Sequence, residues 1–186
     1  MLIDTHPLYG ASRLLKYYKM MTEKAITRIT GEQLRTAQQP GLNSVAVLMQ
    51  HLAGNFLSRW TNFRTEDGEK PWRNRDSEFE DDFESEKELM DYWEKGWNCL
   101  FDAIQTIRED EIHDIIYIRN EGHTILEAIE RQLAHVAYHT GQIVYICKVF
   151  AGDEWKSLTI PKGKTEEYNR KKFSEKKSRG IYRDRT

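Results

Sequence analysis

The stretch EAIERQLAHVAYHTGQIVYICKVF, residues 127–150, has the apolar periodicity of a long amphipathic helix. A capping box from Thr124 to Glu127 precedes it and Gly152 follows it, so the pattern has a start and a stop. Within it, His135 and His139 lie four residues apart. Positions i and i+4 of an α-helix share one face, about 6 Å apart along the axis. Both imidazoles can therefore reach a single ion.

Three more runs have helical periodicity: about Leu8 to Ile29, Ser44 to Phe63, and Ser85 to about Arg108. Ser44 is a favourable N-cap, and Ser85 opens a second capping box with Glu88. Residues 32–41, with a Pro-Gly pair, are expected to form a connection. The link over residues 64–84 is longer than an ordinary helix–helix loop, which indicates a crossover.

These elements predict an all-α protein, an antiparallel four-helix bundle with one long crossover, in which functional side chains face inward. Short extended segments are expected before and after the last helix, at residues 114–122 and 158–161. We expect one bundle domain over residues 1–169 and a basic, disordered tail over residues 170–186.

Composition narrows the functional classes. A formal net charge of −2 argues against a general nucleic-acid binder. No uncharged apolar run approaches the roughly 20 residues of a membrane span, and the N-terminus lacks a signal-peptide pattern, so a cytoplasmic protein is expected. Cys99 and Cys147 form no C-x-x-C pair and fit a reducing compartment. We expect both to be reduced, buried thiols and neither to be a metal ligand.

A third histidine, His51, lies in the second helical run among apolar neighbours. Three imidazoles from facing helices would make a metal site with an open coordination position, the arrangement that suits metal-assisted chemistry. The alternative is a set of hydrogen-bonded polar groups at the edge of the core. Val136 stands where metalloproteases carry a catalytic glutamate after the first histidine, so peptidase chemistry is disfavoured.

Three polar residues share the helix faces of these histidines: Arg131, Gln142 and Asn55. Arg131 is expected either to pair with Glu127 or Glu130, or to bind an anionic substrate group. Gln142 and Asn55 are candidates for orienting a ligand imidazole or a bound water.

The strings MQHLAGN (49–55), IRNEGHT (118–124), AIERQLAH (128–135) and YHTGQI (138–143) resemble the DinB/YfiT-like superfamily. More narrowly, they resemble a branch carried as a domain of unknown function, over about residues 8–169. The resemblance implies a four-helix bundle, often dimeric, with zinc or nickel held by His51, His135 and His139. Asn120 departs from the glycine of many relatives, and no residue matches a catalytic acid or base.

Some members of the superfamily are bacillithiol- or mycothiol-dependent S-transferases, and one is an isomerase. The resemblance therefore implies a metal-dependent transferase that uses a low-molecular-weight thiol, with Arg131 as a candidate to hold its carboxylate. A metal-dependent hydrolase and a non-catalytic, metal-stabilised dimeric bundle are the alternatives. The expected partners are a small-molecule substrate and a second copy of the chain, with neither nucleic acid nor a membrane.

Overall fold

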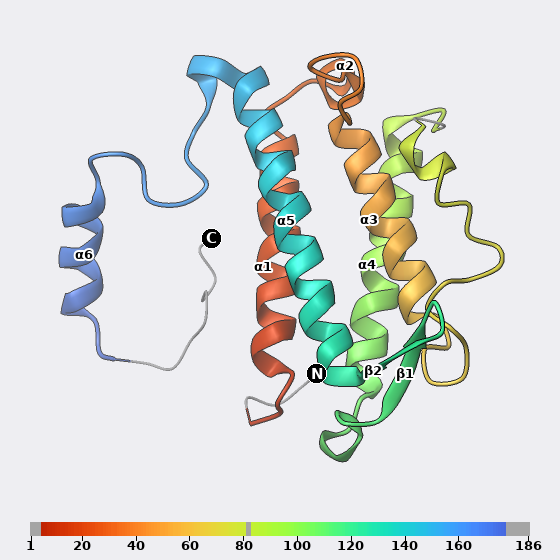
Figure 1. The fold of residues 1–186 in the computed structure, drawn as a ribbon. Coiled ribbons are helices and arrows are strands. Elements are labelled where there is room, and N and C mark those ends of the chain that lie inside the picture. The colour runs from red at the N-terminus through yellow and green to blue at the C-terminus, as the bar shows by residue number, and fades with distance from the viewer. Residues whose placement is uncertain (1–4, 81–82, 178–186) are drawn as a thin grey trace.

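Four long helices pack side by side in the computed structural model, which describes residues 5–80 and 83–177 (Figure 1). They are α1 (Tyr9–Ile26), α3 (Val45–Trp60), α4 (Glu86–Thr106) and α5 (Ile125–Ala151). Helix α3 packs against α4 and α5, and α1 packs against α5. Two short helices, α2 (Gly31–Arg35) and α6 (Thr165–Ser174), and a two-stranded sheet, β1 (Ile115–Ile118) with β2 (Glu121–Thr124), complete the described elements. The prediction of a mainly helical chain is confirmed.

The long helices begin where side chains accept the unpaired N–H groups of a first turn. Ser44 accepts from the N–H of Val47, and Thr124 and Glu127 form the complete capping box that the sequence predicts. At α4 only half of the predicted box forms. Ser85 accepts from the N–H of Glu88, but the Glu88 carboxylate accepts the N–H of Glu84 instead of that of Ser85.

The first helix is shorter than predicted. It ends at Ile26, and Thr30 caps a separate helix, α2, inside the expected connection. The Thr30 hydroxyl accepts the N–H of Gln33, whose side chain accepts the N–H of Thr30. A Thr-Gly pair such as Thr30-Gly31 can either end a helix or begin one. Here it begins α2, and the burial of Leu34 in the core favours that outcome.

Strands β1 and β2 form an antiparallel hairpin, so the extended segment predicted before α5 is present. Its turn residues, Arg119 and Asn120, have φ angles of 57° and 61°. Such a turn favours asparagine or glycine, so Asn120 suits its position in the turn. The Asp67 carboxylate accepts both turn N–H groups at 2.8 Å and fastens the hairpin to the crossover.

The chain after α5 differs from the prediction in two ways. Residues 158–161 bend without strand pairing, and Pro161 has no N–H to donate to a ladder. Helix α6 runs across the expected end of the domain at residue 169. The remainder of the predicted disordered tail, residues 178–186, lies outside the described residues.

Both cysteines are free thiols, as predicted. Cys147 is fully buried, and burial raises its pKa to about 12, whereas Cys99 is half-buried beside Thr61. Among the described residues, no helix is both long and apolar enough to cross a membrane.

Candidate metal centre

The structure brings His51 of α3 together with His135 and His139 of α5. One ring nitrogen from each lies within 4.8 Å of the other two. The Nε2 atoms of His51 and His135 are 3.2 Å apart. Two nitrogens that each lie about 2.0–2.1 Å from one ion at tetrahedral angles would be roughly 3.3–3.4 Å apart. The cluster could therefore hold a divalent metal ion.

Hydrogen bonds to the other ring nitrogens orient two of these imidazoles. His51 Nδ1 lies 2.9 Å from Glu78 Oε2, and His139 Nδ1 lies 3.0 Å from Gln142 Oε1. Both oxygens are acceptors, so each Nδ1 carries the proton. That tautomer leaves the Nε2 lone pairs for a metal, in the manner of known carboxylate–histidine–metal triads.

The electrostatics of the cluster favour the neutral form of His135 and His139, which is the form that binds metals. Burial lowers the pKa of His135 to about 3, and the neighbouring His139 and His51 lower it further. Burial also lowers the pKa of His139, although its bond to Gln142 partly opposes this. The unprotonated Nε2 of His51 faces the Nε2 of His135, so two lone pairs meet unless a proton or a cation lies between them. The donor set fits a divalent cation.

Glu78, the partner of His51, is a site residue that the sequence analysis missed. It lies in a short 3-10 turn of the crossover, Ser77–Phe79, with 5% of its surface exposed. Arg73 donates to both of its oxygens, from Nε at 2.7 Å and from Nη2 at 2.8 Å. Burial alone would raise the pKa of Glu78, but hydrogen bonds from His51 and Arg73 hold it below its ordinary value. The carboxylate is therefore charged and fixed in place.

The same segment of the crossover covers the His51 ring. Phe79 stacks on it with ring centroids 5.1 Å apart, and the Arg75 guanidinium lies 5.0 Å from the Phe79 centroid. A Cβ at Gly54 would lie only 2.4 Å from the nearer Glu78 oxygen, so this glycine leaves the space that the carboxylate occupies. In the sequence, only the unusual length of the link over residues 64–84 indicated a role for this segment.

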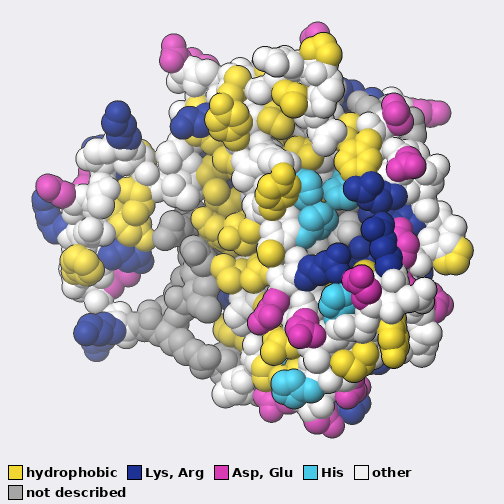
Figure 2. Space-filling view, viewed as in Figure 1, with side chains coloured by type: hydrophobic (Ala, Val, Ile, Leu, Met, Phe, Trp, Pro, Cys, Tyr) yellow, Lys and Arg dark blue, Asp and Glu magenta, His cyan; other side chains and the backbone are white. Residues whose placement is uncertain are grey.

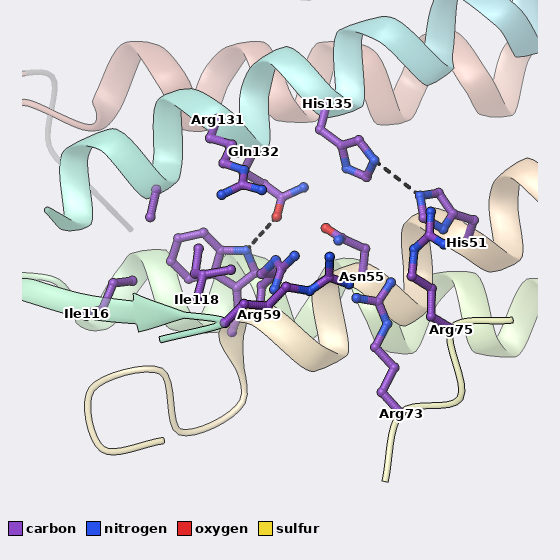
Figure 3. Close-up of a pocket in the computed structure, with 13 residues that line it drawn as sticks. His51, Asn55, Arg59, Arg73, Arg75, Ile116, Ile118, Arg131, Gln132 and His135 are labelled. Carbon is purple, nitrogen blue, oxygen red and sulfur yellow. Dashed lines mark hydrogen bonds between the residues drawn. The ribbon is translucent and has the colours of Figure 1, made fainter. Parts of the chain in front are cut away.

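The three polar residues chosen from the sequence lie in different places. Asn55 and Arg131 line a cavity of about 230 Å³ that His51 and His135 also line (Figure 3). Gln142 does not line it and instead holds His139. Among the described residues Arg131 forms no ion pair, so the alternative pairing with a glutamate of its own helix is wrong. For one of the two glutamates the structure gives the reason: Glu127 forms the cap of α5 with Thr124.

The remaining histidines lie away from the cluster. His6 contacts the carbonyl of Ile107 at 3.0 Å, His123 lies 3.4 Å from an Arg131 nitrogen, and His113 is exposed. Four arginines that were not expected from the sequence line the cavity with Arg131: Arg59, Arg73, Arg75 and Arg119. Figure 2 shows this basic patch directly beside the histidine side chains. The arginines lie in separate segments without a shared periodicity, so no sequence signal connects them.

Comparisons with known proteins add the family and the fold. A family model described as protein of unknown function (DUF1572) matches residues 5–164. No curated protein matches the chain. The crystal structure of a conserved protein from Enterococcus faecalis is similar, with a TM-score of 0.63 and 18% identity over 81% of this chain and 100% of that one. At that identity the likeness concerns the fold alone. Because the family model spans most of its length, the chain belongs to the family described as protein of unknown function (DUF1572).

Proposed function

We propose that the protein is a metal-dependent enzyme for a small-molecule substrate, in which His51, His135 and His139 hold a divalent ion within a DinB-like antiparallel four-helix bundle. The convergence of the three imidazoles, two of them oriented through Nδ1, carries this proposal. Three protein ligands are fewer than zinc or nickel takes, which leaves room for a substrate atom. A cavity reaches two of the three ligands.

We infer that the reaction is transfer of a small thiol to an electrophile. Bound zinc or nickel would supply the Lewis acidity that lowers the pKa of the thiol. The sulfur then forms a bond to the electrophile, the leaving group departs with the electron pair, and the thiol proton passes to solvent. The arginines of the cavity bind and orient the reactants, and Glu78 keeps the proton of His51 on Nδ1.

The composition of the cavity favours transfer over hydrolysis. Among its described lining residues there is no aspartate or glutamate, and its two histidines are the proposed metal ligands. Hydrolases usually rely on a general base within hydrogen-bond reach of the attacking water. Attack by an ionised thiol needs no such group.

A conjugation assay tests this function. The zinc- or nickel-loaded protein should speed the consumption of a small thiol by an electrophile such as chlorodinitrobenzene, measured by absorbance. The rate should fall to the uncatalysed level after removal of the metal and in His139→Ala, with samples lacking added thiol correcting for Cys99 and Cys147. Uncatalysed rates at full metal occupancy, across several thiols and electrophiles, would exclude the transferase. Ester hydrolysis by the same sample would then support the metal-dependent hydrolase. If the sample hydrolysed no ester either, a purely structural role of the metal would be supported.

We also propose that the protein forms a homodimer through α5. Tyr138, Tyr145 and Val149 lie at helical spacing along one face of this helix and are 65%, 66% and 51% exposed. Figure 2 shows hydrophobic side chains gathered over this part of the molecule. A row of large apolar side chains on one helix can pack against the same row of a second copy related by a two-fold axis.

Light scattering tests the dimer. The wild-type chain should have twice the monomer mass, and Tyr145→Glu should yield monomers because it places a charge in the apolar contact. Tyr117→Glu, which changes an exposed tyrosine on β1, should leave the dimer intact. A wild-type monomer at all concentrations would contradict the proposal.

A further inference from the structure

The cavity beside the histidines is lined by an unusual concentration of positive charge. Five arginines reach it from four parts of the chain: Arg59 from α3, Arg73 and Arg75 from the crossover, Arg119 from the hairpin turn, and Arg131 from α5. Figure 3 shows labelled arginine side chains reaching from α5 and from the crossover toward the space around Asn55. No carboxylate is among the described lining residues. Such a wall would be repulsive unless something anionic occupied it.

The carboxylates behind the wall offset only part of this charge. Glu78 binds Arg73, and Glu69 lies within 3.5 Å of guanidinium nitrogens of Arg59, Arg73 and Arg119. In the described part of the chain, no carboxylate pairs with Arg75 or Arg131. Burial lowers the pKa of Arg59 to about 10, with Arg73 lowering it further, Glu69 opposing this, and Arg131 and Arg119 adding smaller effects. The cavity therefore carries unbalanced positive charge.

Neutral donors point to the same kind of ligand. Gln132 is 4% exposed and lines the cavity, and its Oε1 accepts the indole N–H of Trp60 at 3.0 Å. Its Nε2 is buried and has no acceptor. Asn55, which is also buried, points toward the same space (Figure 3). A buried donor without a partner is costly, and an oxygen-rich ligand would satisfy the Nε2 of Gln132.

The other side of the cavity is apolar, and its size limits the ligand. Ile116 and Ile118 of β1, Trp60 and Ala128 form this side. The volume of the cavity is about 230 Å³. It is below the range of about 300 Å³ and above that is common for drug-sized ligands. A compact anion with a short carbon chain fits these dimensions.

We infer that this cavity is a binding site for a small molecule bearing a multiply charged oxyanion, a phosphate or a dicarboxylate, which the arginines hold beside His51 and His135. Guanidinium groups match both anions because they donate two parallel hydrogen bonds. The inference rests on the proposed function only for the reaction that the bound molecule undergoes. Anion binding is a property of the protein without metal and is tested separately.

Calorimetry on metal-free protein, with the chelator removed by dialysis, tests the site. The probes are pyrophosphate, inorganic phosphate, succinate and acetate. We expect pyrophosphate, phosphate or succinate to bind at least about tenfold more tightly than acetate, because a second charge engages a second guanidinium. Tighter binding of the phosphates indicates a phosphorylated ligand, and tighter binding of succinate indicates a dicarboxylate.

Variants link binding to the cavity. Arg131→Ala and Arg75→Ala should each weaken the preferred anion at least about tenfold. Both side chains are exposed and have no carboxylate to release, so folding should be unaffected. Arg170→Ala, an exposed arginine of α6, removes the same charge elsewhere and should leave affinity unchanged. Equal affinity for acetate and the other anions, or equal loss in all three variants, would overturn the inference. Thiol transfer without anion selectivity would overturn it while leaving the proposed function intact.

Discussion

Replacement of His135 with alanine is expected to reduce the affinity for zinc or nickel by more than about 100-fold, since loss of a supporting residue alone costs about 10–100-fold. The two remaining imidazoles must then compete with water for the ion. The three rings lie at similar distances from one another: 5.2 Å between His51 and His135, 5.1 Å between His51 and His139, and 4.6 Å between His135 and His139. Titration against a chromophoric chelator measures the affinity, and circular dichroism confirms the fold.

A smaller loss of metal affinity should follow when the residue that supports a metal ligand is changed and the ligand itself is kept. Glu78→Gln keeps the size of the side chain but removes the charge that fixes Arg73 and the Nδ1 proton of His51, so a loss of about 10–100-fold is expected. Glu66→Gln is the matched control, because the partners of Glu66 in the described part of the chain are Asn62 and Lys70, and neither belongs to the histidine cluster. Unchanged stoichiometric binding by the His135 variant would refute the metal site.

Substitution of Gly96 with alanine is expected to destabilise the protein by about 1–3 kcal/mol, the usual cost of overpacking. A Cβ at this position of α4 would lie 2.7 Å from the Cα of Ala53 and 2.9 Å from its carbonyl oxygen. These are backbone atoms of α3 and cannot rotate away, so the two helices must separate. Ala53 lies two residues from both His51 and Asn55. Metal affinity should therefore fall together with stability.

Chemical denaturation measures this effect, and Gly141→Ala is its matched control. Gly141 also lies within a helix, but a Cβ there would meet nothing within 4 Å. Its replacement should stabilise the protein by about 0.5–1 kcal/mol, because alanine loses less backbone entropy in a helix. If both substitutions stabilised the protein, the close approach of α3 and α4 would be wrong.

The helices and the histidine pair could be predicted because their causes are local. The Thr124–Glu127 box joins groups three residues apart, and the apolar periodicity before and after His135 follows from the 3.6-residue turn. The same spacing puts His135 and His139 on one face wherever the helix lies. His51 could be selected because a histidine amid apolar helical neighbours must find a partner.

Tertiary structure alone decided what surrounds these histidines. Glu78 meets His51 across 27 positions of sequence, from a link whose acidic residues otherwise resemble a solvated loop. The five arginines come from four segments, and only the packing of α3, α5, the crossover and the hairpin makes them one surface. Contacts of this kind depend on how helices and loops pack, which leaves no periodic trace in the sequence. The histidine cluster could be predicted because its residues lie in periodic helical segments. The charge of the adjoining cavity could not be predicted, because its arginines lie in segments that share no periodicity.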